Sequence, residues 1–552
     1  MTWGTFDPDE GLVFVPLGGV GEIGMNLYAY GCDGRWLAVD CGVAFRDDKA
    51  PGTEVVMADP QFLADRRASL DGLVLTHAHE DHIGAVAQLW PRLRCPVYGT
   101  AFTLAMLEGK LAEAGIEIPL TRIPLGGSFS CGPFDLRYVT LTHSIPEPSA
   151  LVIATPYGTV VHSGDWKLDE SPLVGEGFDR AALSALGDAG VLAVVGDSTN
   201  APVPGRSGSE AGAREALVAA MASVRGRVVV GCFASNAARV ESIAHAAGLA
   251  GRDVCLLGRS LHRVVEASAA AGRPLDLGRV VPEADAGSVP DGRICMIATG
   301  SQGEPRAALA RIAQGTHPGV SLGAGDTVIF SSRVIPGNER AVLDVQNALV
   351  SLGVEILTAR ELPGIHVSGH PAQDELKSLY GWLRPRILIP VHGESLHLDA
   401  HARLGKSLGI PNVIVPFDGV VVRIAPGEAE KIGTVPVGRL AQDGTRLLSL
   451  ESETLRNRRR IMYNGMAVVT LVIDGKGDLQ LPPRIAAPGL LEEGDAAVAS
   501  AVEAAIEAVR QVSETGRPRE DLLQETVRRA VRRCLRVATG KRPVTLVQVM
   551  KV

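Results

Sequence analysis

One short stretch constrains this chain more than any other: THAHEDHIG at residues 76–84. It directly follows the apolar, strand-like segment GLVLT (72–76). A loop at a strand end can point alternate side chains the same way, which would set 77, 79 and 81 together and turn 82 aside. Imidazole and carboxylate donors suit zinc, or manganese where oxygen donors dominate. A solvated polar loop is the alternative, but H-x-H-x-D-H after a buried strand favours a metal site. The stretch offers four candidate ligands: His77, His79, Asp81 and His82.

Further ligands should come from other strand ends, because four side chains split over two directions close one tetrahedral site poorly. Three other strand-like segments end in a ligand-type residue beside Ser or Gly: His143, Asp165 and His392. The repeated pattern of a strand followed by a ligand strengthens the prediction of a metal site with distant contributors.

A glycine motif near the N-terminus would by itself indicate a dinucleotide-binding site, but the residues that follow it do not fit such a site. Residues 19–24 fit GxGxxG, and Asp40 follows at a distance suited to a dinucleotide site. That fold needs a helix after the glycines, to present its N-terminus to the pyrophosphate. Here a strand, an Asp-Gly turn and another strand follow. We therefore expect a tight loop beside the site.

The predicted secondary structure changes along the chain. Short strands separated by turns fill the first 200 residues, and buried strands then alternate with helices, which predicts a parallel α/β sheet. A polar, basic segment later suggests a linker. The predicted divisions are residues 1–205 and 365–450 for two parts of one domain, 206–364 for an inserted domain, 451–463 for the linker and 464–552 for a C-terminal α/β domain.

The composition bears on the cellular compartment of the protein and on its partners. The eight cysteines include no CxxC pair, which indicates a reducing compartment and no thiolate zinc site. We see neither a signal peptide nor an apolar run long enough to cross a membrane, so we expect a cytoplasmic protein without a membrane partner. The net charge of −8 does not favour nucleic acid as a partner, although local basic runs matter more than the total.

Several motifs together carry a family resemblance. HAHEDH, the LTHS histidine and the SGD aspartate resemble the metallo-β-lactamase superfamily, an αββα sandwich. GDSTNA (196–201), HVSGH (366–370) and PVHGE (390–394) resemble its β-CASP branch, which acts on nucleic acids. PLGGVGEIGMN (16–26), TGSQGE (299–304) and SSRVIPGNE (331–339) are similar to the bacterial ribonuclease J family. The resemblance implies an α/β fold with an inserted β-CASP parallel α/β domain and a small C-terminal α/β domain.

The resemblance also implies a ligand set. Two divalent metal ions per subunit are expected, with Zn²⁺ favoured and Mn²⁺ or Mg²⁺ as alternatives. The first ion would take His77, His79 and His143, the second Asp81, His82 and His392, and Asp165 would bridge them. Asp40 and Asp197 would lie behind the ligands and orient them.

The implied activity is 5′→3′ exonucleolytic cleavage of 5′-monophosphorylated, single-stranded RNA, in RNA maturation and decay. A hydroxide shared by the metals would attack phosphorus, with Asp81, Asp197 and His370 in the catalytic set and His370 as general acid. Internal cleavage is a second mode, and the balance between the two stays open. The residues expected to bind RNA phosphates are His366, Ser368, Gly369, His370, Ser301, Ser331 and Arg333.

The oligomeric state, the partners and two alternative functions can also be considered from the sequence. The resemblance implies a homodimer or homotetramer and suggests RNA-decay helicases as partners. Arginines of the linker and of the tail could support RNA binding, but the tail arginines fit a solvated helix face or a subunit contact better. One alternative is a hydrolase of small thioesters or lactams, which the inserted domain disfavours. Another is a metal-free scaffold, which the complete ligand set disfavours.

Overall fold

The structure, a computed structural model, describes residues 8–45, 49–335, 337–492, 494–514 and 519–552. Outside these ranges lie the first seven residues of the predicted N-terminal domain and one proline of the SSRVIPGNE motif. The chain divides into two compact units. One comprises Met1–Ala44 with Met57–Gly438, and the other comprises Phe45–Val56 with Arg439–Val552.

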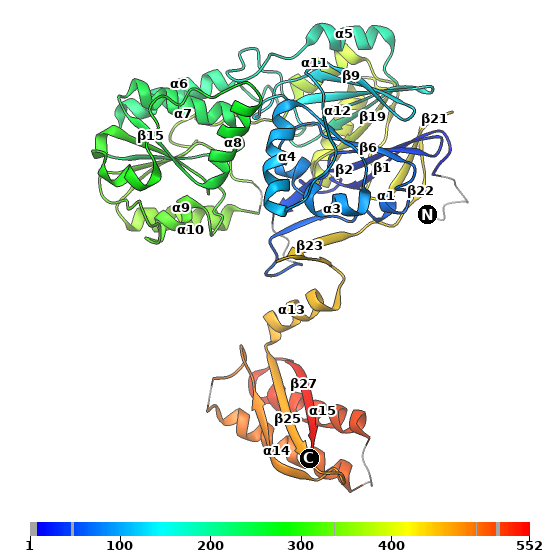
Figure 1. The fold of residues 1–552 in the computed structure, drawn as a ribbon, viewed down its shortest axis with the longest axis vertical. Coiled ribbons are helices and arrows are strands. Elements are labelled where there is room, and N and C mark those ends of the chain that lie inside the picture. The colour runs from blue at the N-terminus through cyan, green and yellow to red at the C-terminus, as the bar shows by residue number, and fades with distance from the viewer. Residues whose placement is uncertain (1–7, 46–48, 336, 493, 515–518) are drawn as a thin grey trace. The chain divides into compact units, whose positions relative to one another are not determined.

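The first unit contains two facing sheets (Figure 1). The eight-stranded sheet runs β22 (Glu430–Thr434), β21 (Val420–Ala425), β1 (Leu12–Gly18), β2 (Leu27–Cys32), β3 (Arg35–Val39), β6 (Leu70–Val74), β7 (Val97–Gly99) and β8 (Leu120–Arg122). The seven-stranded sheet runs β20 (Asn412–Val413), β19 (Ile387–Val391), β13 (Ala193–Asp197), β12 (Gly158–His162), β11 (Ser149–Thr155), β10 (Phe134–Thr140) and β9 (Ser128–Cys131). Their inner faces share one aliphatic and aromatic core, in which Phe14, Tyr30, Tyr138, Ile153 and Ile389 are buried.

Helices cover both outer faces of this sandwich. The helices of this part are α1 (Gln61–Ala64), α2 (Glu80–Ile83), α3 (Val86–Leu93), α4 (Ala101–Ala114), α5 (Arg180–Ala189), α11 (Gln373–Leu383) and α12 (Ser395–Ser407). Leu183 of α5 and Leu376 of α11 pack in a second core on the seven-stranded sheet. On the eight-stranded sheet, the ring of Trp36 meets that of Phe62 in α1 at 4.9 Å between centroids. This arrangement confirms the predicted αββα sandwich.

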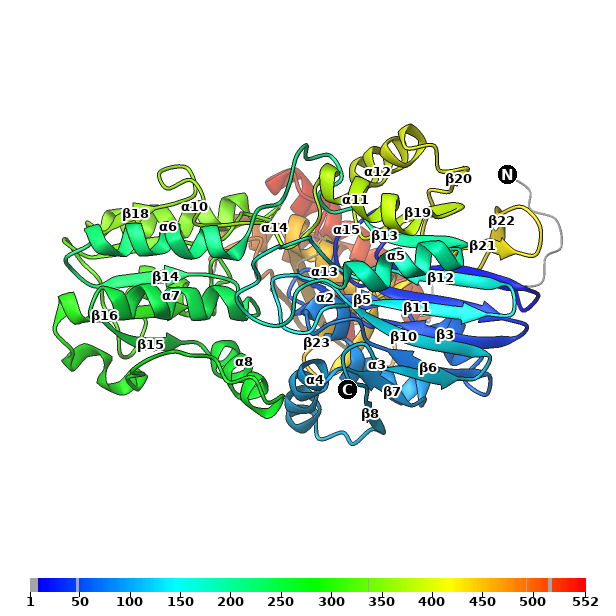
Figure 2. The same ribbon diagram turned by 90° about the horizontal axis from the view of Figure 1, so that it is seen from above.

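The inserted domain is a parallel sheet between two helical layers (Figure 2). The strand order is β15 (Asp253–Leu257), β16 (Ile294–Ala298), β14 (Val228–Gly231), β17 (Thr327–Phe330) and β18 (Glu355–Leu357). Its helices are α6 (Glu210–Ser223), α7 (Ala237–Leu249), α8 (Arg259–Ala270), α9 (Ala308–Ala313) and α10 (Glu339–Ser351), with 3₁₀ turns at Glu283–Ser288 and Asp291–Arg293. Val228 and Val230 face α6 and α7, and Val229 faces α9 and α10, as the alternation of a strand requires. The predicted parallel α/β sheet is confirmed.

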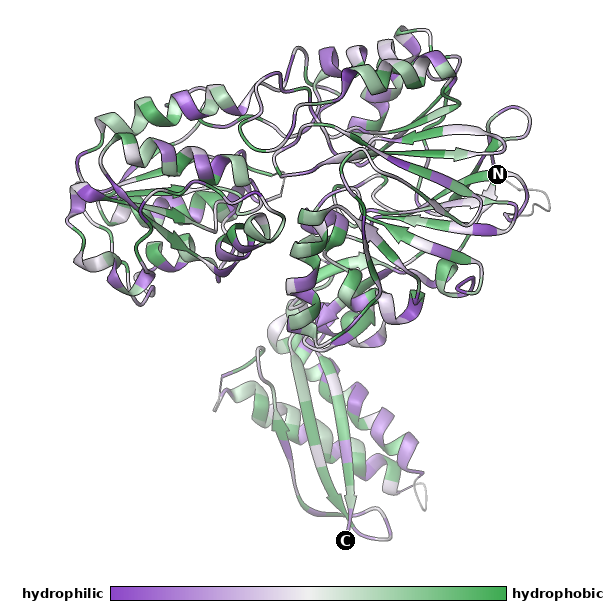
Figure 3. Cartoon of the chain, turned by 45° about the horizontal axis from the view of Figure 1, so that its top comes forward, coloured by the Kyte–Doolittle hydropathy of each residue, from purple (hydrophilic) through white to green (hydrophobic). Residues whose placement is uncertain are grey.

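In the second unit, β23 (Arg439–Asp443) pairs antiparallel with β24 (Arg446–Ser449). The strands β4 (Val43–Phe45) and β5 (Val55–Ala58) lie where the chain passes from one unit to the other. The segment predicted as a linker forms helix α13 (Glu453–Asn464), capped by the Ser452 side chain on Leu455 N. A three-stranded sheet of β26 (Leu479–Ala486), β25 (Met466–Ile473) and β27 (Val544–Lys551) follows. Helices α14 (Ala496–Ser513) and α15 (Glu520–Thr539) pack on one face of it. Figure 3 shows hydrophobic residues concentrated on its strands.

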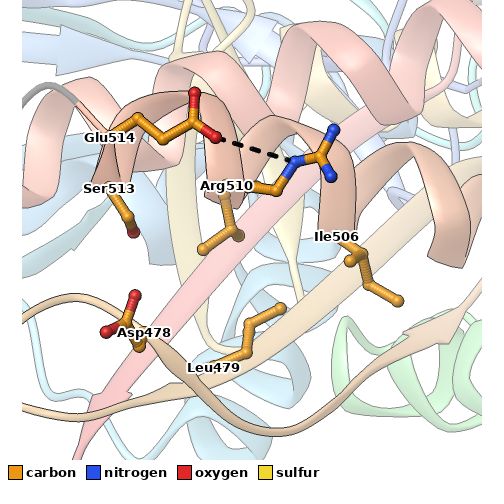
Figure 4. A pocket seen from close by; sticks show the side chains of 7 residues that line it. Asp478, Leu479, Ile506, Arg510, Ser513 and Glu514 are labelled. Atoms are coloured by element: carbon orange, nitrogen blue, oxygen red, sulfur yellow. Dashed lines mark ion pairs between the residues drawn. The ribbon is translucent and has the colours of Figure 1, made fainter.

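Helix α14 and β26 also enclose a shallow cavity of about 330 Å³ in the second unit (Figure 4). Ile506, Arg510 and Leu479 line it, and Arg510 reaches toward Glu514, the residue that follows α14. The cavity is open and holds no unpartnered buried polar group, among the residues that the structure describes.

Candidate metal centre

The HAHEDH segment joins a buried strand to a short helix. After β6 the chain runs extended through His77 and His79, and α2 begins at Glu80. Asp81 and His82 are therefore helical neighbours that point into one cluster. The expectation that position 81 would face 77 and 79 while 82 turned aside is wrong, because the helix replaces strand-like alternation after residue 79.

A first cluster gathers His77, His79, His143 and Asp165. The Nε2 atom of His77 lies 3.1 Å from Nδ1 of His79, and Nε2 of His143 lies 3.0 Å from the same Nδ1. The Asp165 carboxylate is 3.7 Å from His77 Nε2. Three imidazole nitrogens and one carboxylate oxygen thus converge on one point, as a tetrahedral cation requires.

A second cluster shares Asp165 and adds Asp81, His82 and His392. The Asp165 Oδ2 atom is 3.2 Å from Nε2 of His82 and 3.3 Å from Nε2 of His392. Asp81 Oδ2 lies 3.6 Å from each of these two nitrogens. Asp165 therefore stands between the two groups, where a bridging ligand would stand.

The residues of both clusters fit divalent cations. Within each cluster the donor atoms lie within 4.8 Å of one another. Asp165 Oδ1 and both ring nitrogens of His392 are buried without a hydrogen-bond partner. Unpartnered buried polar atoms are costly and rare, so these atoms indicate a missing partner. A metal ion bound by imidazole and carboxylate would supply it.

Asp40 holds one ligand from behind. Its carboxylate accepts a bond from Thr76 N at 2.8 Å and lies 2.7 Å from Nδ1 of His82. Both groups are buried, and Asp40 adopts a left-handed backbone with φ of 61°. With Nδ1 as donor to the carboxylate, Nε2 of His82 keeps its lone pair toward the second cluster.

Asn26 is a supporting residue that sequence reasoning missed. Its backbone N and its side-chain Nδ2 both donate to the carbonyl of Asp81, at 3.1 and 3.0 Å. Tyr28 donates to Asn26 Oδ1 at 2.7 Å and so fixes the amide. The available signal was the position of Asn26 at the end of the PLGGVGEIGMN motif.

Electrostatics favour neutral histidines in the first cluster. Burial lowers the pKa of His77 and His143 well below the ordinary value and that of His79 to about 4. Burial also disfavours charge on His82, but the carboxylates of Asp165, Asp81 and Asp40 outweigh it and raise its pKa. Neutral imidazoles are the form that binds metal, so the first cluster is poised for a cation.

His370 and Asp197 stand on a third side of Asp165. Nδ1 of His370 lies 2.8 Å from Asp197 Oδ2 and 3.8 Å from Asp165 Oδ2. Burial disfavours charge on this ring, yet Asp197 and Asp165 overcome it and raise the pKa of His370 to about 9. A protonated imidazole beside the ligands is placed to donate a proton.

The HVSGH segment, in the loop between β18 and α11, lies near three cationic side chains. His366 is largely buried with Nδ1 unpartnered, and burial lowers its pKa to about 3, helped by Arg239, Arg333 and Lys167. Ser368 Oγ accepts from Asn200 Nδ2 at 2.7 Å. Arg239 and Lys167 are paired with Glu210 and Asp169, whereas Arg333 is exposed, so Arg333 is the cation placed to meet an anion such as phosphate.

The hydroxyl of Ser331 has another use than the predicted one. It donates to the carbonyl of Ile365 at 2.6 Å and accepts from Arg239 at 2.8 Å, so its only hydrogen is already engaged. Ser301 is buried after β16, and its carbonyl accepts from Gln302. Arg333 is exposed and reaches Asn200 Oδ1 at 3.5 Å. Of these three residues predicted to bind phosphate, Arg333 lies beside Asn200, which also bonds Ser368 of HVSGH.

Arg239 and Asn200 are further residues that sequence reasoning missed. Arg239 is completely buried in α7 and pairs with Glu210 at 3.0 Å. Asn200 ties Ser368 to the GDSTNA loop that carries Asp197. Asn200 could have been found as the last polar residue of GDSTNA, whereas an arginine inside an apolar helix gave no signal.

The glycine-rich loop and Glu80 have contacts of their own outside the two clusters. The glycine-rich loop does not precede a helix; it lies beside the ligand loop, with Gly21 N donating to Gly393 O at 2.9 Å. Glu80, the remaining acid of the HAHEDH segment, pairs with Lys110 of α4 at 2.6 Å. Neither residue set contributes a donor to the two clusters.

Four family models match the chain. They are described as a beta-lactamase superfamily domain (residues 35–193), the beta-CASP domain of ribonuclease J (225–349), a Zn-dependent metallo-hydrolase RNA specificity domain (364–416) and the ribonuclease J C-terminal domain (453–552). Their order along the chain agrees with the fold: the sandwich, the inserted parallel sheet, the last part of the sandwich, and the C-terminal sheet with α14 and α15.

Curated relatives align over nearly the whole chain. Ribonuclease J of Sinorhizobium meliloti is 46% identical over 553 residues, covering 99% of this chain and 98% of the relative. Ribonuclease J of Mycolicibacterium smegmatis is 38% identical, with 98% of each chain covered. Ribonuclease J of Thermus thermophilus is 34% identical, covering 98% and 95%.

A solved structure from Enterococcus faecalis, titled as a protein of unknown function, matches with a TM-score of 0.51 at 14% identity. It covers 75% of this chain and 99% of that chain, and at this identity the match concerns the fold alone. Across the described ranges, no helix is both long enough and apolar enough to cross a membrane.

Proposed function

The chain belongs to the ribonuclease J family of metal-dependent ribonucleases, and from this membership we propose that it degrades RNA from a 5′-monophosphorylated end. Internal cleavage is proposed as its second mode. The RNA would be single-stranded where it enters the site. The observation that carries the proposal is the position of Asp165, between two metal-type clusters and beside the His370–Asp197 pair.

We propose two divalent cations, with zinc as the favoured metal and manganese or magnesium as alternatives. The first would be held by His77, His79 and His143, and the second by Asp81, His82 and His392, with Asp165 shared. Bound there, two such ions supply an activated water and neutralise charge on the phosphoryl oxygens. Asp40 and Asn26 hold the second ligand set in place through His82 Nδ1 and the Asp81 carbonyl.

His370 is proposed as the general acid for the leaving 3′-oxygen. Its Nδ1 faces Asp197, which keeps the ring protonated and fixes its orientation. We place the remaining nitrogen, Nε2, toward the substrate. A general acid of this kind contributes about 10²- to 10⁴-fold to a rate.

The HVSGH pocket would select the end of the RNA. We place this pocket at His366, Ser368 and Arg333, of which Arg333 is the exposed cation. A terminal 5′-monophosphate bound there would set the next phosphodiester at the clusters, which gives exonucleolytic release of single nucleotides. A 5′-triphosphate carries two more phosphoryl groups, which the pocket would have to accommodate.

We further propose the cytoplasm as the site of action and RNA maturation and decay as the process. We also propose a homodimer or homotetramer as the assembly and RNA-decay helicases as partners. The domain limits at 205, 364, 450 and 463 remain proposals. Family membership leaves little room for a hydrolase of small thioesters, and the complete ligand set disfavours a metal-free scaffold.

The test compares one uniformly labelled RNA carrying either a 5′-monophosphate or a 5′-triphosphate, with metal or with a chelator. We expect mononucleotide release from the monophosphate form, abolished by the chelator and by His79→Ala. A matched control, His262→Ala, changes a histidine outside both clusters and should leave the rate unchanged. Equal cleavage of both RNAs would contradict the end selection, and cleavage that survives chelation would contradict the metal centre.

A further inference from the structure

A backbone carbonyl of the phosphate pocket touches a ligand of the first cluster. The Gly369 carbonyl oxygen lies 2.6 Å from Nδ1 of His143. A carbonyl can only accept, so Nδ1 carries the hydrogen and Nε2 keeps its lone pair. That Nε2 atom lies 3.0 Å from His79 Nδ1, inside the first cluster. The Gly369 carbonyl therefore selects the tautomer of His143 that can bind a metal.

Both neighbours of Gly369 are anchored. Ser368 Oγ accepts from His370 N at 3.2 Å and from Asn200 Nδ2 at 2.7 Å. The His370 carbonyl also accepts from Asn200, and the His370 ring lies against Asp197. The peptide that holds His143 is thus part of the same hydrogen-bonded turn in which we place the phosphate pocket.

Position 369 has no room for a side chain on the side that faces His143. A Cβ atom at position 369 would lie 2.5 Å from His143 Cε1 and 2.7 Å from Nδ1. It would also lie 3.0 Å from Ser144 Oγ. Distances under 3.0 Å force a shift, so any side chain at 369 must displace the ligand or the turn.

We propose that the Gly369 peptide is a positioning link through which a 5′-phosphate in the HVSGH pocket and a divalent cation at His77, His79 and His143 strengthen each other's binding. The inference rests on the proposed function and adds a regulation of its site. An anion that orders the turn also orients His143, and a cation that fixes His143 also fixes the turn. Such linkage is reciprocal, so each ligand must change the other's affinity by the same factor.

The experiment measures the binding of uridine 5′-monophosphate to the full chain, both zinc-loaded and chelator-stripped, by calorimetry. Zinc release to a chromophoric chelator is followed in parallel, with the nucleotide or with uridine. We expect zinc to tighten nucleotide binding about five- to tenfold, at the low end of typical couplings. The nucleotide, but not uridine, should strengthen zinc binding by the same factor.

Gly369→Ala separates the link from simple attraction between cation and phosphate, which would survive the substitution. In this variant we expect the factor to fall below about twofold while the stripped chain still binds the nucleotide. Gly381→Ala is the matched control, because a methyl at Gly381 meets nothing within 4 Å. Asn200→Ala loosens the same turn without adding an atom and should lower the factor too, which covers a failure of Gly369→Ala to fold.

A factor that persists unchanged in both variants would overturn the link. A factor of one in the unsubstituted chain, with nucleotide binding and RNA cleavage intact, would overturn it as well and leave the proposed function standing. Absence of both nucleotide binding and cleavage would instead refute the proposed function, and the link with it.

Discussion

The substitution Asp40→Asn tests how the second cluster is held. The Asp40 carboxylate accepts from Thr76 N at 2.8 Å and from His82 Nδ1 at 2.7 Å. An asparagine can keep the bond from Thr76 through Oδ1, which leaves its NH₂ group facing His82. Two donors cannot face each other, so His82 must move its hydrogen to Nε2. That nitrogen would then no longer be able to bind a cation.

The size of the effect follows from the lost contact. A hydrogen bond to a charged group contributes about 1.5–3 kcal/mol. At roughly 1.4 kcal/mol per factor of ten, this corresponds to about 10- to 100-fold weaker binding at the second cluster, the range found when residues behind metal ligands are changed. The first cluster keeps all its ligands and should keep its cation.

The assay is the zinc content and the zinc dissociation constant of Asp40→Asn, together with its rate on 5′-monophosphorylated RNA. We expect one tightly bound zinc ion, one weakly bound, and a rate restored in part by excess zinc. Asp188→Asn, at an exposed residue of α5, is the matched control. Two zinc ions bound as tightly as in the unsubstituted chain would refute the tautomer argument.

Three further changes probe separate parts of the account. Arg239→Met leaves the buried Glu210 without its cationic partner and should lower the free energy of unfolding in urea by about 3–5 kcal/mol; a smaller loss in Arg239→Met with Glu210→Gln would support that cause, and an equal loss would contradict it. His370→Gln should slow single-turnover cleavage about 100-fold or more with RNA affinity retained; an unchanged rate would remove His370 as the acid. Burial lowers the pKa of His401 from 6.5 to about 4. Between these pH values the unfolded chain binds a proton at this ring and the folded chain does not. Stability should fall as pH drops from 6.5 toward 4, by up to roughly 1.4 kcal/mol per pH unit from this residue, and His401→Gln should flatten the profile; parallel profiles would contradict it.

The sequence revealed the parts of the site that depend on side-chain identity. His143, Asp165 and His392 were recognisable because each follows a buried strand, and parallel strands bring such ends to one edge of a sheet. The αββα sandwich and the parallel insertion were likewise predictable, from alternating and continuous apolar runs. The family resemblance then divided the ligands into two sets.

The parts that escaped prediction depend on the backbone or on distant packing. The Gly369 carbonyl has no side chain to announce its bond to His143, 226 residues away. The helix at Glu80 is a single turn, too short for any periodicity to show. Ser331 looked like a phosphate donor, but its hydroxyl is taken by Ile365 through a fold contact that spacing does not encode.

Anomalous diffraction at the zinc edge, on crystals of the zinc-loaded chain, tests the central claim most directly. The account predicts two peaks, one among His77, His79 and His143 and one among Asp81, His82 and His392, with the Asp165 carboxylate between them. A single peak, or peaks that leave Asp165 without a metal neighbour, would contradict the dinuclear centre.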